Sequence, residues 1–400
     1  MADLSQRALQ IKPSPTIAMN KRAADMTRTG RDVIPLSLGE PDFHTPESVK
    51  AAGIAAIQQN FTKYTASEGF GPLKKAIATK LQQQNGLNFT ADEIVVGSGS
   101  KTMFLAAFWA VVDPGCEVVI PAPYWVSYPD LVELAGGSAV VVRCDESSGF
   151  KLTPPELERV LTPKTRAIVF NSPNNPTGAV YSEKEISALA AVLRKHPKVW
   201  VITDELYEHI VYDNQRVVYF AKAAAEIADR VITICGFSKS YVMTGWRLSF
   251  AAGSRALITA LADTLSQIHG APNSIAQAAA IEALQGDQSF LAANRKVFQE
   301  RRDLVVERVN RIAGLHALKP PGAFYVYVNC SAWIGRTSAA GRKLADDVAV
   351  VEALLEEAAV ATVPGESFGL SPYFRISYAL EMERLRTAMD RLGEFAHGLR

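Results

Sequence analysis

The chain has 400 residues, and because a single hydrophobic core usually stops growing at roughly 250–300 residues, we expect a large domain and a smaller one. The formal net charge of +1 gives no basic field for nucleic acid or an anionic membrane, and no segment reaches the roughly 20 apolar residues that span a bilayer. The four scattered cysteines include no CxxC pair and no neighbouring His cluster, so we expect a cytoplasmic protein without disulfides or a metal site.

The first part of the chain alternates short β-branched runs with longer amphipathic stretches. The predicted strands, in chain order, are residues 93–96, 117–120, 166–170, 199–203 and 231–235. Predicted helices cover residues 102–112, which Asp113-Pro114-Gly115 ends, and residues 182–195. Apolar strands separated by helices predict a mostly parallel central sheet with helices on both faces.

The pattern changes after Leu257. A long helix over residues 290–312 precedes a strand at 323–328, a helix at 348–358 and a strand at 374–378, which together indicate an α+β domain. We therefore expect a large domain over residues 46–290 and a small C-terminal domain over residues 291–400. Residues 1–45 should pack on the small domain and on a partner subunit.

Polar residues follow four of the predicted strands. They are Gly97-Ser98-Gly99-Ser100, the run from Asn171 to Gly178, Asp204 and Lys239. The carboxyl ends of parallel strands meet at one edge of a sheet, so these residues should face one crevice.

These residue types are the ones that pyridoxal phosphate needs. A lysine amine can attach the cofactor covalently, and a carboxylate keeps its ring nitrogen protonated. A glycine-rich helix start offers backbone N–H groups to the phosphate, and Arg247 can add a two-pronged contact.

Longer motifs carry a family resemblance. The run from Ser238-Lys239 to Trp246-Arg247 resembles the lysine signature of class I aminotransferases of fold type I. Three further motifs match that family: Asn174-Asn175-Pro176-Thr177-Gly178, Asp204-Glu205-Leu206-Tyr207 and Pro123-Tyr124-Trp125. The resemblance extends from Lys12-Pro13-Ser14 to Phe374-Arg375-Ile376-Ser377-Tyr378. It implies a pyridoxal-phosphate-dependent, ping-pong aminotransferase and a homodimer with active sites at the interface.

The resemblance also implies a role for each matching residue. Lys239 would hold the cofactor and move the substrate α-proton, Asp204 would pair with the ring nitrogen, and Tyr207 and Asn175 would bond the ring oxygen. The remaining cofactor contacts would be Trp125 on the ring face, with Ser98, Gly99, Ser100, Arg247 and, across the dimer interface, Tyr64 around the phosphate. The substrate α-carboxylate would meet Arg375, assisted by Gly39 and Asn175, beside Trp125.

Within the family, the chain resembles the bacterial aspartate and aspartate/prephenate aminotransferase branch. This implies transfer from L-aspartate to 2-oxoglutarate, with Lys101 and Thr16 near the distal carboxylate of the substrate. A basic residue matching Lys12 is linked to prephenate use, which would give arogenate. Ile268 and His269 stand where relatives carry small hydroxyl and amide residues, so an aromatic or other amino acid stays open as the substrate.

Other functions remain possible from sequence. A β-eliminating lyase would share the fold and the cofactor. A cofactor-binding regulator would carry a DNA-binding extension, which we do not expect here. Gly365-Glu366-Ser367-Phe368-Gly369 fits the G-x-S-x-G pattern of serine hydrolases, but we expect a turn there that leads to Arg375.

Overall fold

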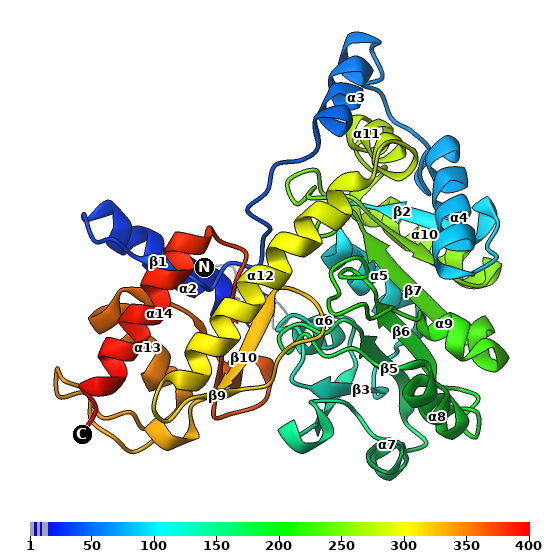
Figure 1. Ribbon diagram of the computed structural model, residues 1–400. Coiled ribbons are helices and arrows are strands. Elements are labelled where there is room, and N and C mark those ends of the chain that lie inside the picture. Colours follow the sequence, from blue (N-terminus) through cyan, green and yellow to red (C-terminus); the bar gives the residue numbers. More distant parts are fainter. Residues whose placement is uncertain (1–3, 6–8, 10–14) are drawn as a thin grey trace.

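A computed structural model describes residues 4–5, 9 and 15–400 of the chain. Figure 1 shows a large body around a twisted sheet and a smaller body that contains the C-terminal part of the chain. The long helix α12 (Ser289–Arg311) runs from the neighbourhood of α11 in the large body to that of β9 in the smaller one. Among the described helices, none has both the length and the apolar character needed to cross a membrane.

The large body is built on a seven-stranded sheet of described residues. Its strands are β2 (Ile94–Gly97), β3 (Glu117–Ala122), β4 (Ser138–Arg143), β5 (Thr165–Asn171), β6 (Trp200–Asp204), β7 (Val231–Gly236) and β8 (Ser249–Ala252). Their order across the sheet is β2-β8-β7-β6-β5-β3-β4. The pairs from β7 to β4 are parallel, and β8 is antiparallel to both of its neighbours. The sheet is therefore mostly parallel, as the sequence predicts.

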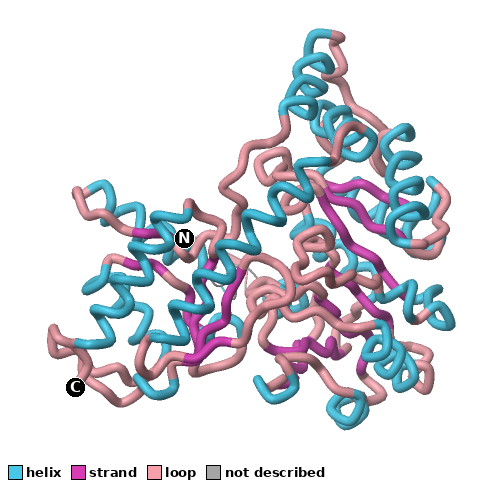
Figure 2. Tube along the Cα trace, viewed as in Figure 1, coloured by secondary structure: helices cyan, strands magenta, loops and turns pink. Residues whose placement is uncertain are grey.

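Helices cover both faces of this sheet (Figure 2). They are α3 (Glu47–Gln58), α4 (Gly71–Asn85), α5 (Ser100–Val111), α6 (Tyr128–Leu134), α7 (Pro154–Val160), α8 (Glu183–Leu193), α9 (Phe220–Ala223), α10 (Arg255–His269) and α11 (Ser274–Gln285). One apolar core lies between the sheet and the helices α5, α6 and α10. A second core lies on the opposite side, with α4, α8 and α11. Strand residues alternate between the two cores, which explains the continuous apolar runs in the sequence.

The smaller body pairs an antiparallel sheet with helices. Its elements are β9 (His316–Ala317), β10 (Tyr325–Asn329), α13 (Asp347–Ala358), β11 (Val360–Ala361), β12 (Val363–Pro364), β13 (Tyr373–Ser377) and α14 (Met382–His397). The order across its four-stranded sheet is β12-β13-β10-β9. The N-terminal segment lies here too, because β1 (Ile34–Pro35) pairs in parallel with β11 and Arg22 of α2 (Pro15–Arg28) forms ion pairs with Glu352 and Glu356 of α13.

The predicted strands and helices are present, with ends shifted by a few residues. The sequence reasoning did not predict β4, an edge strand with half-exposed side chains, or β8, a four-residue strand reached through the loop after Lys239. The Gly365–Phe368 segment is a single helical turn between β12 and β13, with no α-helix after it. Ser367 therefore lacks the strand-to-helix turn that a hydrolase nucleophile requires.

Candidate active site

A cavity of about 280 Å³ lies where the parallel strands end. It brings together residues that the sequence predicts for the site: Thr16, Gly39, Ser100, Lys101, Trp125, Asn175, Asp204, Tyr207, Lys239, Arg247 and Arg375. Trp125 follows β3, Asn175 follows β5 and Lys239 follows β7, while Arg375 comes from β13 of the smaller body. The cavity is therefore closed on one side by strand ends of the large sheet and on the other by the smaller body.

Asp204 is the last residue of β6 and is only 5% exposed. Its carboxylate accepts a hydrogen bond of 2.5 Å from the Tyr128 hydroxyl and one of 3.2 Å from the Leu206 backbone N–H. Burial raises the pKa of Asp204 to about 6, although the Tyr128 hydrogen bond opposes this shift. A buried carboxyl group facing a cavity can stabilise a positive charge placed beside it.

Lys239 reaches the same cavity from the loop after β7. Its amine donates a hydrogen bond to the Gly39 carbonyl oxygen, in the segment that links the N-terminal strand to α3. Burial lowers the pKa of the Lys239 amine to about 8, with Glu40 opposing the shift and Arg375 adding to it. The amine is therefore easier to deprotonate than an ordinary lysine.

An anion-binding arrangement lies at the start of α5. Gly99 precedes the helix with a φ of 87°, and Ser100 is its first residue. A side chain at Gly99 would overlap the Arg247 guanidinium, so glycine allows that close approach. The N-terminus of the twelve-residue helix and the arginine together favour a negatively charged group.

A second cationic group lies deeper in the cavity. Arg375 is 2% exposed and donates hydrogen bonds to the Asn175 side chain at 2.9 Å and to the Ser37 carbonyl oxygen at 2.8 Å. Its guanidinium lies 4.4 Å from the ring centre of Tyr325, and its Nε has no hydrogen-bond partner among the residues that the structure describes. The Tyr325 hydroxyl is 3.0 Å from that of Tyr207. Arg375 is thus held in place while keeping a donor free for a ligand.

Lys101 and Trp125 form another wall of the cavity. The Lys101 amine lies 5.5 Å from the centre of the Trp125 ring. Desolvation lowers the pKa of Lys101, with Asp130 opposing the shift and Arg247 adding to it. Thr16 and Ile17 approach the cavity from the start of α2. This wall combines a positive charge, an aromatic face and the N-terminal segment.

Some predicted residues lie elsewhere. Ser98 and Gly99 do not line the cavity, although Gly99 contacts Arg247 as described. Ile268 and His269 do not line it either, and both ring nitrogens of His269 are buried with no hydrogen-bond partner in the described part of the chain. Tyr64 is 95% exposed and does not face the cavity of its own chain. Lys12 lies outside the described residues.

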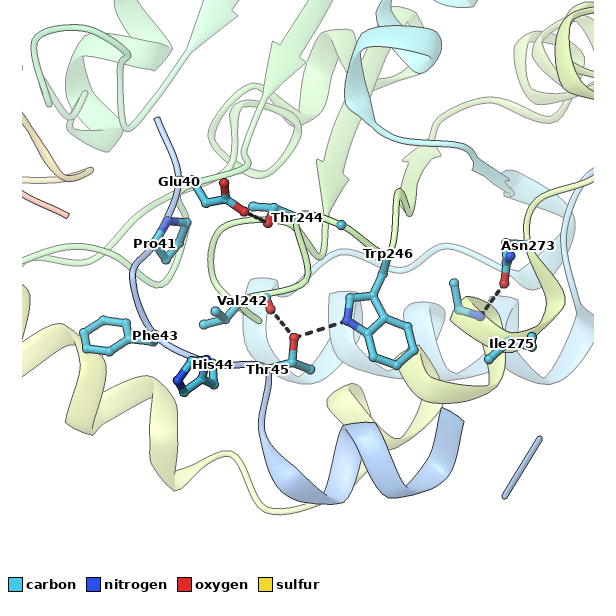
Figure 3. Close-up of a pocket in the computed structure, with 12 residues that line it drawn as sticks. Glu40, Pro41, Phe43, His44, Thr45, Val242, Thr244, Trp246, Asn273 and Ile275 are labelled. Carbon is cyan, nitrogen blue, oxygen red and sulfur yellow. Dashed lines mark hydrogen bonds between the residues drawn. The ribbon is translucent and has the colours of Figure 1, made fainter. Parts of the chain in front are cut away.

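A second cavity, of about 520 Å³, lies beside the loop that follows Lys239 (Figure 3). Thr45 joins its two sides, because its hydroxyl donates to the Val242 carbonyl oxygen at 2.6 Å and accepts from the Trp246 indole at 3.1 Å. Thr244 lines both cavities and donates a hydrogen bond to Glu40. These bonds hold the loop that leads to Arg247 against the segment that follows Gly39.

Sequence reasoning missed two residues that shape the site. Tyr128 bonds Asp204, and Tyr325 contacts both Tyr207 and Arg375. Tyr128 lies one helical turn after Trp125, which is a local signal that could have found it. Tyr325 reaches the cavity only because β10 and β13 are paired, with Tyr327 opposite Arg375. No local pattern in the sequence reveals that contact.

Comparison with known proteins gives the same class of protein as the fold and the cavity. The sequence model of the family "Aminotransferase class I and II" matches residues 31–392. An aspartate/prephenate aminotransferase of Cereibacter sphaeroides is 51% identical over 399 residues, with 100% of each chain covered. An aspartate aminotransferase of Rhizobium meliloti is 47% identical over 97% of this chain and 95% of that protein.

Solved structures agree with this assignment. The crystal structure of the aspartate aminotransferase from Rhizobium meliloti superposes with a TM-score of 0.97 at 46% identity and covers 100% of both chains. The aspartate aminotransferase from Thermus thermophilus with maleate gives a TM-score of 0.92 at 39% identity, over 99% of this chain and 100% of that one. The fold is therefore that of the fold type I aminotransferases. The chain belongs to the aminotransferase class I and II family and is an aminotransferase, and members of this family depend on pyridoxal phosphate.

Proposed function

We propose that this chain transfers the amino group of L-aspartate to 2-oxoglutarate, with pyridoxal phosphate as its cofactor. The observation that carries the proposal is that the Lys239 amine and the buried Asp204 carboxyl group line one cavity together with two arginines. Burial moves the pKa of Lys239 down to about 8 and that of Asp204 up to about 6. Near neutral pH, Lys239 can thus lose a proton readily while Asp204 is mostly ionised.

The residues around the cavity fit the cofactor. Asp204 offers a buried carboxylate for the protonated ring nitrogen, and Tyr207 and Asn175 offer a hydroxyl and an amide for the ring oxygen. Trp125 offers an aromatic face for the ring. Ser98, Gly99, Ser100 and Arg247 provide the helix start and guanidinium for the phosphate. The close approach of Gly99 and Arg247, which a side chain at position 99 would block, is the structural support for this fit.

Lys239 is the residue that transfers the substrate α-proton. When bound, pyridoxal phosphate supplies a ring that withdraws electrons from the substrate α-carbon. The Lys239 amine then takes the α-proton and returns it, because desolvation and the nearby Arg375 favour its neutral form. Asp204 holds a proton on the ring nitrogen, and Tyr128 keeps that carboxylate ionised and oriented.

Arg375 and Lys101 support a dicarboxylate substrate. The free Nε of Arg375 and its fixed orientation suit the α-carboxylate, with Gly39 and Asn175 assisting. Lys101 and Thr16 line the same cavity and can meet the distal carboxylate. The named relatives act on aspartate, and one of them on prephenate, according to their names. Use of prephenate by this chain would rest on Lys12.

We also propose a homodimer with active sites at the interface. Tyr64 is almost fully exposed, and Ile54 and Ile57 of the nearby α3 are more than half exposed, which supports a covered surface there. The large domain would span residues 46–290 and the small one residues 291–400. Residues 1–45 would pack on the small domain and on the partner subunit. Four free cysteines support a reducing, cytoplasmic environment.

The experiment that tests this function is a panel of amino donors with 2-oxoglutarate. We expect glutamate and oxaloacetate from L-aspartate, with the parallel-line kinetics of a ping-pong mechanism. L-Alanine is the matched control donor, because it lacks the distal carboxylate. Failure to form glutamate from any donor would reject transamination. Steady release of pyruvate and ammonia without an acceptor would instead establish a lyase.

A further inference from the structure

A buried ion pair lies behind the candidate active site, outside its cavity. Lys80 of α4 is 3% exposed, and Glu208, four residues after Asp204, is 6% exposed. The Lys80 amine donates hydrogen bonds to both oxygens of the Glu208 carboxylate and to Asn85 at 3.0 Å. Glu208 also accepts a hydrogen bond of 2.6 Å from Tyr219. Neither member of the pair lines the cavity.

Glu208 connects the two chain segments that carry the proposed catalytic groups. Residues 204–210 carry Asp204 and Tyr207, and residues 235–241 carry Lys239. The Cys235 thiol lies 3.3 Å from the Glu208 carboxylate. The His209 ring nitrogen Nε2 lies 3.5 Å from Glu208 and 3.4 Å from the Tyr241 hydroxyl. Glu208 therefore contacts the second segment directly at Cys235, before Lys239, and reaches Tyr241, after Lys239, through the ring of His209.

The two segments follow the paired strands β6 and β7, whose ladder ends with Asp204 opposite Ile234. The Glu205 N–H donates to the Ile234 carbonyl oxygen at 2.9 Å, and the Ser240 hydroxyl lies 3.5 Å from the Leu206 carbonyl oxygen. The loop that follows β7 has no regular secondary structure until β8 begins at Ser249. Side-chain contacts to Glu208 thus add a constraint to the pairing of β6 with β7 and to the hydrogen bonds of Thr45 and Thr244.

We propose that Glu208, held by Lys80, is a positioning residue that sets Lys239 against Asp204. The proposal rests on the proposed function of those two groups. Buried ion pairs can often be replaced by apolar residues without loss of stability, so stability alone does not explain this pair. Catalytic groups, by contrast, must be held within about 0.5 Å of their productive geometry. Glu208 belongs to the first segment, is held by two hydrogen bonds from Lys80 and contacts Cys235 of the second segment, and so meets that need.

The test uses a variant that removes the whole charged cluster. Glu208→Leu alone would leave the buried Lys80 without its oppositely charged partner and would destabilise the fold. The triple variant Lys80→Met/Glu208→Leu/Tyr219→Phe removes both charges and the phenol that Glu208 accepts from. Arg302→Met is the control, because Arg302 is fully buried and ion-paired to Asp213 but does not line the cavity.

Two measurements separate positioning from stability. Each is made on the cofactor-loaded protein well below the melting temperature of the variant. We expect kcat of the triple variant to fall roughly 10- to 100-fold with little change in KM for aspartate. We also expect the visible circular dichroism per bound cofactor to fall, because this signal depends on how the cofactor is oriented. Arg302→Met should lower the melting temperature and leave that signal unchanged.

The outcomes distinguish this inference from the proposed function. Wild-type kcat and wild-type visible circular dichroism in the triple variant would overturn the positioning role. An equal loss of visible circular dichroism in Arg302→Met and in the triple variant would also overturn the positioning role. Destabilisation of the fold at any buried ion pair would then explain the lost signal. Failure of the wild-type protein to bind the cofactor would instead reject the proposed function.

Discussion

Replacing Tyr128 with phenylalanine should raise the pKa of Asp204. The Tyr128 hydroxyl donates a 2.5 Å hydrogen bond to Asp204, and burial, with the nearby Asp204 charge, holds the pKa of Tyr128 well above its usual value. Tyr128 therefore stays a donor at any working pH. Phenylalanine keeps the ring that packs against Phe104 and Trp125, so the change removes little besides the hydrogen bond.

The size of the effect follows from that bond. A hydrogen bond to a charged group contributes about 1.5–3 kcal/mol, and one pKa unit corresponds to about 1.4 kcal/mol. Losing the bond should raise the pKa of Asp204 by about 1–2 units above its value of about 6. The Leu206 N–H would remain as a donor to Asp204 and would limit the rise in its pKa. The pKa of Asp204 in the cofactor-free variant would then be about 7–8, so at neutral pH about half or more of this carboxyl group would be protonated.

The assay is a pH titration of cofactor-free protein carrying carbon-13-labelled aspartate, followed by NMR. The Asp204 signal is assigned by its absence in Asp204→Asn. Tyr181→Phe is the control, because Tyr181 is also buried but its hydroxyl accepts from the Leu152 N–H, whereas the donors to the Asp204 carboxylate are Tyr128 and Leu206. Titration of Asp204 at the same pH in Tyr128→Phe and in the wild type would refute the role of this hydrogen bond.

Three further predictions concern the cationic groups of the cavity. Lys101→Ala should lower kcat/KM for aspartate about 10- to 100-fold and change kcat/KM for alanine little, because only a dicarboxylate reaches this amine. Equal losses for the two donors would reject the role of Lys101 in binding the distal carboxylate. Arg375→Lys should lower kcat/KM for both donors by roughly 100-fold, since lysine cannot form two parallel hydrogen bonds to a carboxylate; steady-state kinetics showing a loss for aspartate alone would contradict this. In cofactor-free protein, the pKa of Lys239 is lowered to about 8 from 10.5, so the charged amine destabilises the fold below pH 8 and this penalty disappears as the pH rises toward 10.5. Urea unfolding should therefore show the wild type gaining up to about 3 kcal/mol over that range relative to Lys239→Met, and parallel pH profiles for the two proteins would refute the shift.

Local patterns were enough to predict most of the sheet and most of the residues that line the cavity. Strands such as β6 and β7 are buried on both faces, so each is a continuous apolar run that predicts a strand. Because the strands are parallel, Asp204 and Lys239 then come to the same edge of the sheet. The half-exposed β4 and the four-residue β8 lack such a run.

Contacts between distant segments could not be read from the sequence. Tyr325 meets Tyr207 and Arg375 only through the pairing of β10 with β13 and the packing of the smaller body on the large sheet. Lys80 and Glu208 lie 128 residues apart, and neither stands in a pattern that marks it as a partner of the other. The N-terminal strand likewise finds its partner, β11, more than 300 residues away. Such pairs depend on the folded arrangement and not on local spacing.

The most direct test of the account is to find which side chain carries the cofactor. The purified protein is loaded with pyridoxal phosphate, reduced with borohydride to fix the attachment, digested and analysed by mass spectrometry. We expect a single labelled peptide with the phosphopyridoxyl group on Lys239, and no label in Lys239→Ala. A label on another lysine, or none in the wild type, would contradict it.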